Sequence, residues 1–206
     1  MKKALLFLVL LSVSFTYAQE SENKDNRFDF GLALSFGSAD LRNSEFGVVN
    51  GNLQAFNMNA SYLLFQDSFL DDVRLQLGLT FAEFNSTLQL NNLNASLSNS
   101  YVQVPLNVIF STNRDSPIRF NIGGGVNANY FLKSEINELS GSSSQNINKV
   151  TFGYQAITGF DYFLKENFFL GIHFATQGDY SSVRKDGISN RLVRARFLQL
   201  SLGATF

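Results

Sequence analysis

The sequence contains no cysteine and no tryptophan, and only two of its 206 residues are proline. Without cysteine the chain has no disulfide, no thiolate metal site and no attachment point for a lipid anchor. With a single histidine as well, a transition-metal site is not expected. After the first 18 residues no run approaches the 18 continuous apolar residues of a spanning helix, which excludes a helical membrane protein.

The N-terminus has the pattern of an export signal. Lys2 and Lys3 precede an apolar run over residues 4–13, and Ala18 offers a small residue at a cleavage site. The alternative, a membrane anchor, would need about 20 apolar residues. We therefore expect residues 1–18 to be cleaved, residues 19–26 to form a periplasmic lead-in, and residues 27–206 to form the folded domain. Loss of Lys2 and Lys3 leaves 14 basic against 17 acidic residues, a balance that gives no sign of nucleic-acid binding.

The rest of the chain reads as eight strands. In each run apolar residues alternate with small or polar ones, which is the period of a β-strand with one apolar face. Most of these runs span about the 9–11 residues that a tilted membrane strand needs. The runs cover residues 28–36, 53–64, 73–82, 102–110, 118–130, 150–163, 170–175 and 197–206.

The connections between these runs alternate between long and short without exception. Outer-membrane barrels have this pattern, because long loops lie outside the cell and short turns lie in the periplasm. The polar face carries mainly Asn, Gln, Ser, Thr and Gly, which suits a narrow lumen better than a water-exposed sheet surface. We predict an all-β fold, an eight-stranded antiparallel up-and-down transmembrane β-barrel of the outer-membrane type, with both ends of the chain in the periplasm. The expected outer loops are 37–51, 85–100, 134–148 and 178–190, and the expected turns are 66–72, 111–117 and 164–167.

Three short motifs resemble a known family. Tyr101–Phe110 (YVQVPLNVIF), Phe120–Val126 (FNIGGGV) and Ile157–Tyr162 (ITGFDY) are similar to consecutive strands of the PorT-like outer-membrane β-barrel family of Bacteroidota. Gln103 stands where this family often has glutamate. The resemblance extends over the chain after the signal and implies the same barrel fold. The last strand, with its apolar residues at every second position, is similar to the signal read by the barrel-assembly machinery; these residues are Leu198, Leu200, Leu202, Ala204 and Phe206.

No motif of the chain predicts a catalytic, cofactor or metal site. His173 lacks the neighbouring serine of barrel deacylases, so we interpret it as a hydrogen-bonded lumen histidine. Gly123, Gly124 and Gly125 lack the lysine and the helix of a phosphate-binding loop and are expected to serve strand packing.

Two groups of charged residues are the candidate functional sites. Asp29, Arg74, Arg119 and Asp161 share the lumen-facing parity near the periplasmic end, and we predict a cluster that plugs the barrel. The alternative is four independently solvated charges. Arg194 and Arg196 have the lipid-facing parity near the outer rim, and with Arg191 they are predicted to bind lipopolysaccharide phosphates. The alternative there is a β-bulge that turns Arg196 into the lumen.

The sequence favours a non-enzymatic outer-membrane barrel of structural or interaction type, an accessory to a surface or secretion assembly. A narrow channel or a small-ligand-binding barrel is the second hypothesis, and an enzyme of the lumen or rim is the third. The expected partners are the outer membrane, its lipopolysaccharide and the barrel-assembly machinery, with no nucleic acid and no cofactor.

Overall fold

The computed structural model describes residues 28–44, 47–65, 72–90, 93–112, 116–138, 141–165, 167–185 and 188–206. The predicted signal and lead-in lie outside these residues. No helix among the described residues is long and apolar enough to cross a membrane. The strands are β1 (Phe28–Asn43), β2 (Gly47–Phe65), β3 (Asp72–Leu90), β4 (Leu93–Ser111), β5 (Ile118–Glu138), β6 (Gly141–Lys165), β7 (Phe168–Asp179), β8 (Val183–Lys185) and β9 (Ile188–Thr205).

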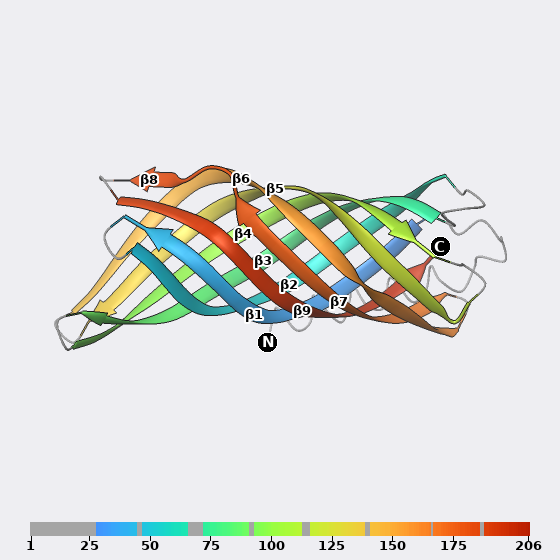
Figure 1. The fold of residues 1–206 in the computed structure, drawn as a ribbon, viewed down its shortest axis with the longest axis horizontal. Coiled ribbons are helices and arrows are strands. Elements are labelled where there is room, and N and C mark those ends of the chain that lie inside the picture. Colours follow the sequence, from blue (N-terminus) through green and yellow to red (C-terminus); the bar gives the residue numbers. More distant parts are fainter. Residues whose placement is uncertain are drawn as a thin grey trace, which may run out of the picture.

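Eight of these strands form a closed antiparallel barrel, as predicted (Figure 1). Each strand pairs with the next along the chain, β7 pairs with β9, and β9 pairs with β1 to close the ring. The short β8 pairs only with β9 and extends one hairpin. Phe28 and Phe206 exchange two backbone hydrogen bonds, so both described ends of the chain lie at the same end of the barrel. We call this the terminal end and the opposite one the hairpin end.

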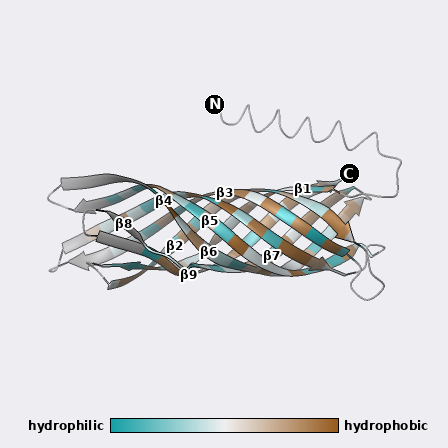
Figure 2. Ribbon diagram, turned by 90° about the horizontal axis from the view of Figure 1, so that it is seen from above, coloured by the Kyte–Doolittle hydropathy of each residue, from teal (hydrophilic) through white to brown (hydrophobic). Residues whose placement is uncertain are grey.

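Hydrophobic residues are concentrated in the half of the barrel nearest the terminal end (Figure 2), and those that face outward form an apolar belt. On β9 the outward residues Leu198, Leu200 and Leu202 are 48%, 47% and 40% exposed. Their inward neighbour Gln199 is only 4% exposed. Apolar side chains outside and polar side chains inside are the reverse of a soluble protein and are typical of a barrel in a bilayer.

The strands are much longer than the sequence predicted. The expected loops 37–51, 85–100 and 134–148 are almost entirely strand in the structure, and the loop expected at 178–190 contains β8 and the start of β9. The prediction was wrong because these Ser- and Asn-rich segments have little apolar alternation, although their backbones pair in regular register. At about 3.3 Å per residue and a tilt of about 40°, the 25 residues of β6 rise roughly 60 Å, more than twice the height of an apolar belt of about 25 Å.

Where the belt ends, the polar side chains change from the inner face of the wall to the outer face, and the apolar ones change from the outer face to the inner face. Along β1 the outward side chains are apolar up to Phe36 and then polar, at Ser38 and Arg42. Inward, Ala39 and Leu41 are each only 2% exposed. Above the belt the outer surface meets water, so the apolar residues must face inward to be buried.

This exchange builds a hydrophobic core inside the hairpin end. Phe84 is 1% exposed and Phe131 is 2% exposed. Further members come from strands around the ring, including Leu41, Leu53, Leu97, Tyr101, Leu192 and Phe197. The same inversion occurs on β3, where Phe81 is exposed at the belt and Phe84 is buried above it. Beyond the belt the lumen is therefore filled by side chains, many of them apolar, with buried polar residues such as Asn99 and Gln177 among them.

Candidate functional site in the barrel lumen

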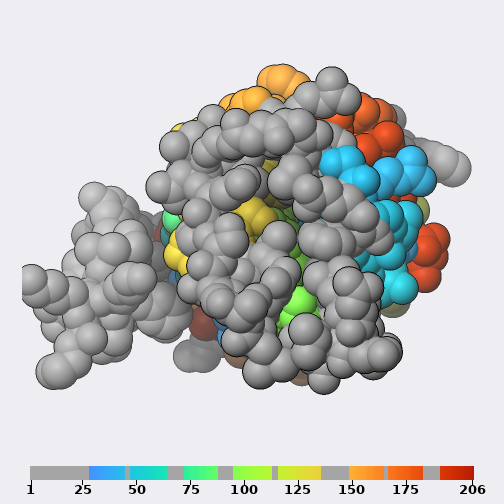
Figure 3. Space-filling model, turned by 90° about the vertical axis from the view of Figure 1, so that its left-hand side faces the viewer, coloured from blue at the N-terminus to red at the C-terminus, as the bar shows by residue number. Residues whose placement is uncertain are grey.

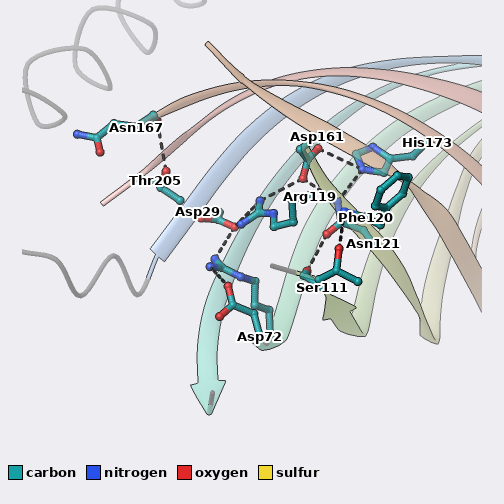
Figure 4. A network of polar contacts seen from close by, with 12 residues as sticks. Asp29, Asp72, Ser111, Arg119, Phe120, Asn121, Asp161, Asn167, His173 and Thr205 are labelled. Carbon is teal, nitrogen blue, oxygen red and sulfur yellow. Dashed lines mark hydrogen bonds and ion pairs between the residues drawn. The ribbon is translucent and has the colours of Figure 1, made fainter. Parts of the chain in front are cut away.

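The four charged residues predicted to cluster are brought together at the terminal end (Figure 4). Arg119 Nη2 lies 3.2 Å from Asp29 Oδ2 and 3.1 Å from Asp161 Oδ2. Arg74 Nη1 forms an ion pair with the same Asp29 oxygen. All four residues are buried, and the two arginines are 2% and 4% exposed. Strands β1, β3, β5 and β6 each contribute one member, so the cluster ties together opposite parts of the wall.

Two further ionisable residues complete the cluster, which we call the lumen charge network. Asp72 Oδ2 accepts a hydrogen bond from Arg74 Nη2 at 2.9 Å. His173 Nε2 lies 3.2 Å from Asp161 Oδ1. Asp72 has the same strand parity as Arg74, two residues along the chain, and this spacing could have identified it. His173 was expected to be a hydrogen-bonded lumen residue, but its contact with Asp161 was not foreseen.

Neutral groups complete the surroundings of the network. Asn121 Nδ2 donates to Asp161 Oδ2 at 2.7 Å, and its side-chain oxygen accepts from Ser111 Oγ at 2.7 Å. The Arg119 guanidinium also lies 4.9 Å from the centre of the Phe163 ring, a cation–π distance. Buried charges are stable only when they are paired and hydrogen-bonded. The contacts meet that requirement for one oxygen of each of the three carboxylates and for at least one nitrogen of each arginine.

A small cavity of about 60 Å³ lies beside the network. Its lining includes Asp29, Arg119 and Ser201. Asp29 Oδ1, Arg119 Nε and Ser201 Oγ have no hydrogen-bond partner in the described part of the chain. A polar cavity of this size can hold ordered water, but it is too small for a typical ligand of several hundred Å³.

A layer of amides fills the lumen above the charge network. Gln103 Nε2 on β4 donates to Gln177 Oε1 on β7 at 2.8 Å, which spans the lumen from one side to the other. Gln177 also contacts the hydroxyl of Tyr101 at 3.3 Å. The position that often carries glutamate in PorT-like proteins therefore holds a neutral cross-lumen bridge in this chain.

Asp179 closes this layer at the end of β7. One carboxylate oxygen accepts from Asn129 Nδ2 at 2.5 Å, and the other accepts from the backbone of Leu192 at 3.3 Å. Leu192 borders a β-bulge, because Asp40 pairs with Arg194 while the next residue of β1 pairs with Leu192, leaving Val193 unpaired. Asp179 therefore supports the bulged backbone from inside the barrel.

The predicted rim arginines lie on the outer surface. Arg194 and Arg196 are exposed, and Arg191 is half-buried. Arg194 Nη2 pairs with Asp40 Oδ2 at 2.9 Å, with 51% of the arginine side chain exposed. The bulge at Val193 lies above Arg196, which remains outward, so the alternative of an arginine turned into the lumen does not describe the structure.

The described residues offer little for catalysis or metal binding. They contain no group of three or more histidine, aspartate and glutamate side chains placed to hold a metal ion. The Nε2 atom of His173 is engaged by Asp161 and Asn121, and the nearby Ser201 hydroxyl has no hydrogen-bond partner in the described part of the chain. A serine nucleophile would need a base within hydrogen-bond reach.

Comparison with known proteins identifies the family. A family model for the outer membrane protein beta-barrel domain matches residues 4–206. The chain belongs to this family. As an outer membrane protein β-barrel domain with a closed ring of strands, it is an outer membrane protein, in agreement with the sequence prediction at this coarser level. The matching model describes outer membrane β-barrel domains in general and does not identify the chain as a PorT-like protein. No match was found among curated proteins.

Solved structures share the fold at low sequence identity. OprG from Pseudomonas aeruginosa is 13% identical, with a TM-score of 0.54 over 89% of this chain and 97% of that one. Neisserial surface protein A is 14% identical, with a TM-score of 0.53 over 86% and 97%. The outer membrane protease OmpT from Escherichia coli is 10% identical, with a TM-score of 0.50 over 91% and 99%. At these identities, the similarity between this chain and the three solved structures shows the barrel fold alone.

Proposed function

We propose that this protein is a non-conducting, non-enzymatic outer membrane barrel of structural or interaction type, with the hairpin end outside the cell. The observation that carries the proposal is the filled lumen. Phe84 and Phe131 are 1% and 2% exposed inside the hairpin end, where a channel would need a polar, water-filled path. The fold alone does not decide function, because the same barrel serves several roles.

The lumen charge network supports closure at the other end. Arg119 contacts carboxylates from β1 and β6, and Arg74 contacts carboxylates from β1 and β3. Small eight-stranded barrels are filled by their own side chains, and here polar and apolar layers do so in turn. Both observations argue against the alternative of a narrow channel.

The long hairpins support an interaction role. Strands β3 to β6 hold 19 to 25 residues, so they extend well past the apolar belt as a paired wall. A rigid wall outside the membrane offers a defined surface for a partner at a low entropic cost. The resemblance to PorT-like barrels supports a role as an accessory to a surface or secretion assembly. The lipid-facing residues of β9, which closes the ring, support recognition of this strand by the barrel-assembly machinery.

Planar-bilayer recording tests the closed lumen. The purified barrel should insert without producing discrete conductance steps, whereas regular steps from the wild-type protein would overturn the proposal. The interaction role is tested by cross-linking in intact outer membranes followed by purification of the barrel. A variant lacking residues 134–145, which retains the Lys133 and Asn146 pair at the new hairpin tip, should lose the partner captured by the wild type. A partner retained by this variant would exclude the β5–β6 extension as its binding surface.

A further inference from the structure

The seam between β1 and β9 carries a cationic patch on its outer surface, just above the apolar belt. The belt ends at one row of paired residues: Ser38 on β1, Arg196 on β9 and Thr176 on β7 are neighbours in the sheet. Two positions nearer the terminal end, the corresponding row consists of Phe36, Leu198 and Phe174. These three apolar side chains are each about half exposed. Arg196 is therefore the first polar outward residue of its strand above the lipid-facing surface.

The bulge at Val193 gathers three arginines of β9 on this surface. Residues 191 and 194 are an odd number of positions apart and would face opposite sides of a regular strand. The extra, unpaired residue Val193 shifts the alternation by one position, so that Arg191 and Arg194 face the same side of the wall. Leu192, next to Arg191, faces inward and is 2% exposed. Arg191, Arg194 and Arg196 thus share the outer face.

Arg42 of β1 belongs to the same patch and was not predicted from the sequence. It is exposed, and it is the register partner of Arg191 across the β1–β9 pair. Like charges directly opposite each other in a sheet are destabilising unless an anion compensates them. In Figure 3, which looks onto the hairpin end, the blue atoms of β1 lie beside red atoms of the C-terminal strands.

Within the described residues, two carboxylates lie near the four arginines of the patch. Asp40 is paired with the patch, at 2.9 Å from Arg194 Nη2. Arg191 donates its Nε–H to the backbone oxygen of Asp179 at 2.9 Å, and the Asp179 carboxylate inside the wall compensates part of the Arg191 charge. Neither Arg42 nor Arg196 has an ion-pair partner in the part of the chain that the structure describes.

Aromatic side chains border the patch on the β7 side. Tyr154 and Tyr180 pack with their ring centres 5.4 Å apart and their planes tilted by 44°, and both are exposed. The Tyr154 hydroxyl passes over Gly178 beside the backbone oxygen of Val193. Exposed tyrosines at a belt edge are typical of the membrane–water interface.

We propose that Arg42, Arg191, Arg194 and Arg196 bind the phosphate groups of a phosphorylated glycolipid of the outer leaflet. The guanidinium fork matches phosphate geometry, and the position at the belt edge matches the headgroup of a lipid rather than a free ion. The lipid's acyl chains would lie against the belt below, on Phe36 and Leu198. The inference rests on the proposed orientation of the hairpin end but not on closure of the lumen.

Native mass spectrometry of the detergent-purified barrel tests the site with three probes: diphosphorylated lipid A, dephosphorylated lipid A and inorganic phosphate. The wild type should retain the diphosphorylated lipid and should hold the other two at least about tenfold more weakly. The double variant Arg42→Gln/Arg196→Gln, which removes the two arginines without an ion-pair partner among the described residues, should lose about tenfold or more of the bound lipid.

Lys133→Gln is the matched control for a single charge. Lys133 is a half-exposed cation on β5, three strands from β9 and four from β1 around the ring, and its loss should leave lipid binding within twofold of wild type. It is compared with the single variant Arg196→Gln, which should bind less. Equal retention of diphosphorylated lipid A by wild type and double variant would overturn the site. Equal binding of inorganic phosphate and of the lipid would assign the patch to free phosphate and overturn the lipid. A reversed epitope pattern on intact cells would instead refute the orientation.

Discussion

Leu41 and Leu192 face each other inside the barrel, one register step from Asp40 and Arg194, which face each other outside it. Both leucines are 2% exposed. This arrangement holds only above the belt, where the outer face of the wall meets water and the inner face must supply the apolar core. The same strands thus follow the rules of a membrane protein at one end and of a soluble protein at the other.

The lumen charge network should contribute strongly to stability. Arg119→Ala leaves Asp29 and Asp161 buried with one cation fewer, which should cost about 3–5 kcal/mol of unfolding free energy. The measurement is urea unfolding in lipid vesicles. Lys133→Ala is the control, because its exposed ion pair with Glu135 should contribute at most about 1 kcal/mol. Equal stability of the two variants would mean that water solvates the lumen charges.

A cavity made in the core of the hairpin end should lower the free energy of unfolding. Phe84→Ala removes a ring that is 1% exposed and should cost about 3–5 kcal/mol in the same unfolding measurement. Thr87→Ala changes an exposed side chain three residues further along β3 and should alter stability by less than about 0.5 kcal/mol. A small effect of Phe84→Ala would show that this part of the lumen is wet.

The position of the belt edge should determine how much an introduced charge lowers the free energy of unfolding. Leu202 is near the middle of the belt on β9, so Leu202→Arg should destabilise the barrel by about 2–4 kcal/mol in vesicles. Ser38→Arg, one row above the belt, should cost about 0–1 kcal/mol. If both substitutions cost the same, the belt extends further toward the hairpin end than its apolar side chains indicate.

The orientation predicts which connections are reached from outside the cell. An epitope placed in the β5–β6 connection should be labelled on intact cells, because the even strand number puts both termini on one side and the proposed orientation makes that side the periplasm. An epitope placed at Asn167, between β6 and β7, should be labelled only after the outer membrane is permeabilised. Labelling of the Asn167 epitope on intact cells would reverse the orientation.

The sequence predicted the part of the fold that lies in the membrane. Alternation such as Leu198, Leu200 and Leu202 on one face is strong there, because lipid requires every outward side chain to be apolar. The same parity argument placed Asp29, Arg74, Arg119 and Asp161 in the lumen, where the structure brings them together.

The sequence did not predict the part of the barrel beyond the membrane. There the inward residues, such as Ala39 and Leu41, are separated by charged or polar ones in a segment otherwise typical of a loop. In the sequence, the apolar residues of this segment change from even positions, up to Phe36, to odd positions after Ser38. This change can be interpreted only if the strand is known to continue past Ser38. The contribution of Arg42 to the rim patch also depends on register with β9 and on the bulge at Val193, neither of which a single strand reveals.

Single-cysteine labelling along β1 shows whether the barrel wall continues past the lipid around a dry interior. The chain has no cysteine of its own, so each variant carries one reactive thiol. In vesicles, Ser38→Cys and Asp40→Cys should react readily with a water-soluble maleimide, while Phe36→Cys should be reached by a lipid-soluble reagent. Ala39→Cys and Leu41→Cys should react with neither until the barrel is unfolded. Rapid labelling of these two inward positions in the folded barrel by the water-soluble maleimide would mean that water fills the lumen beyond the membrane.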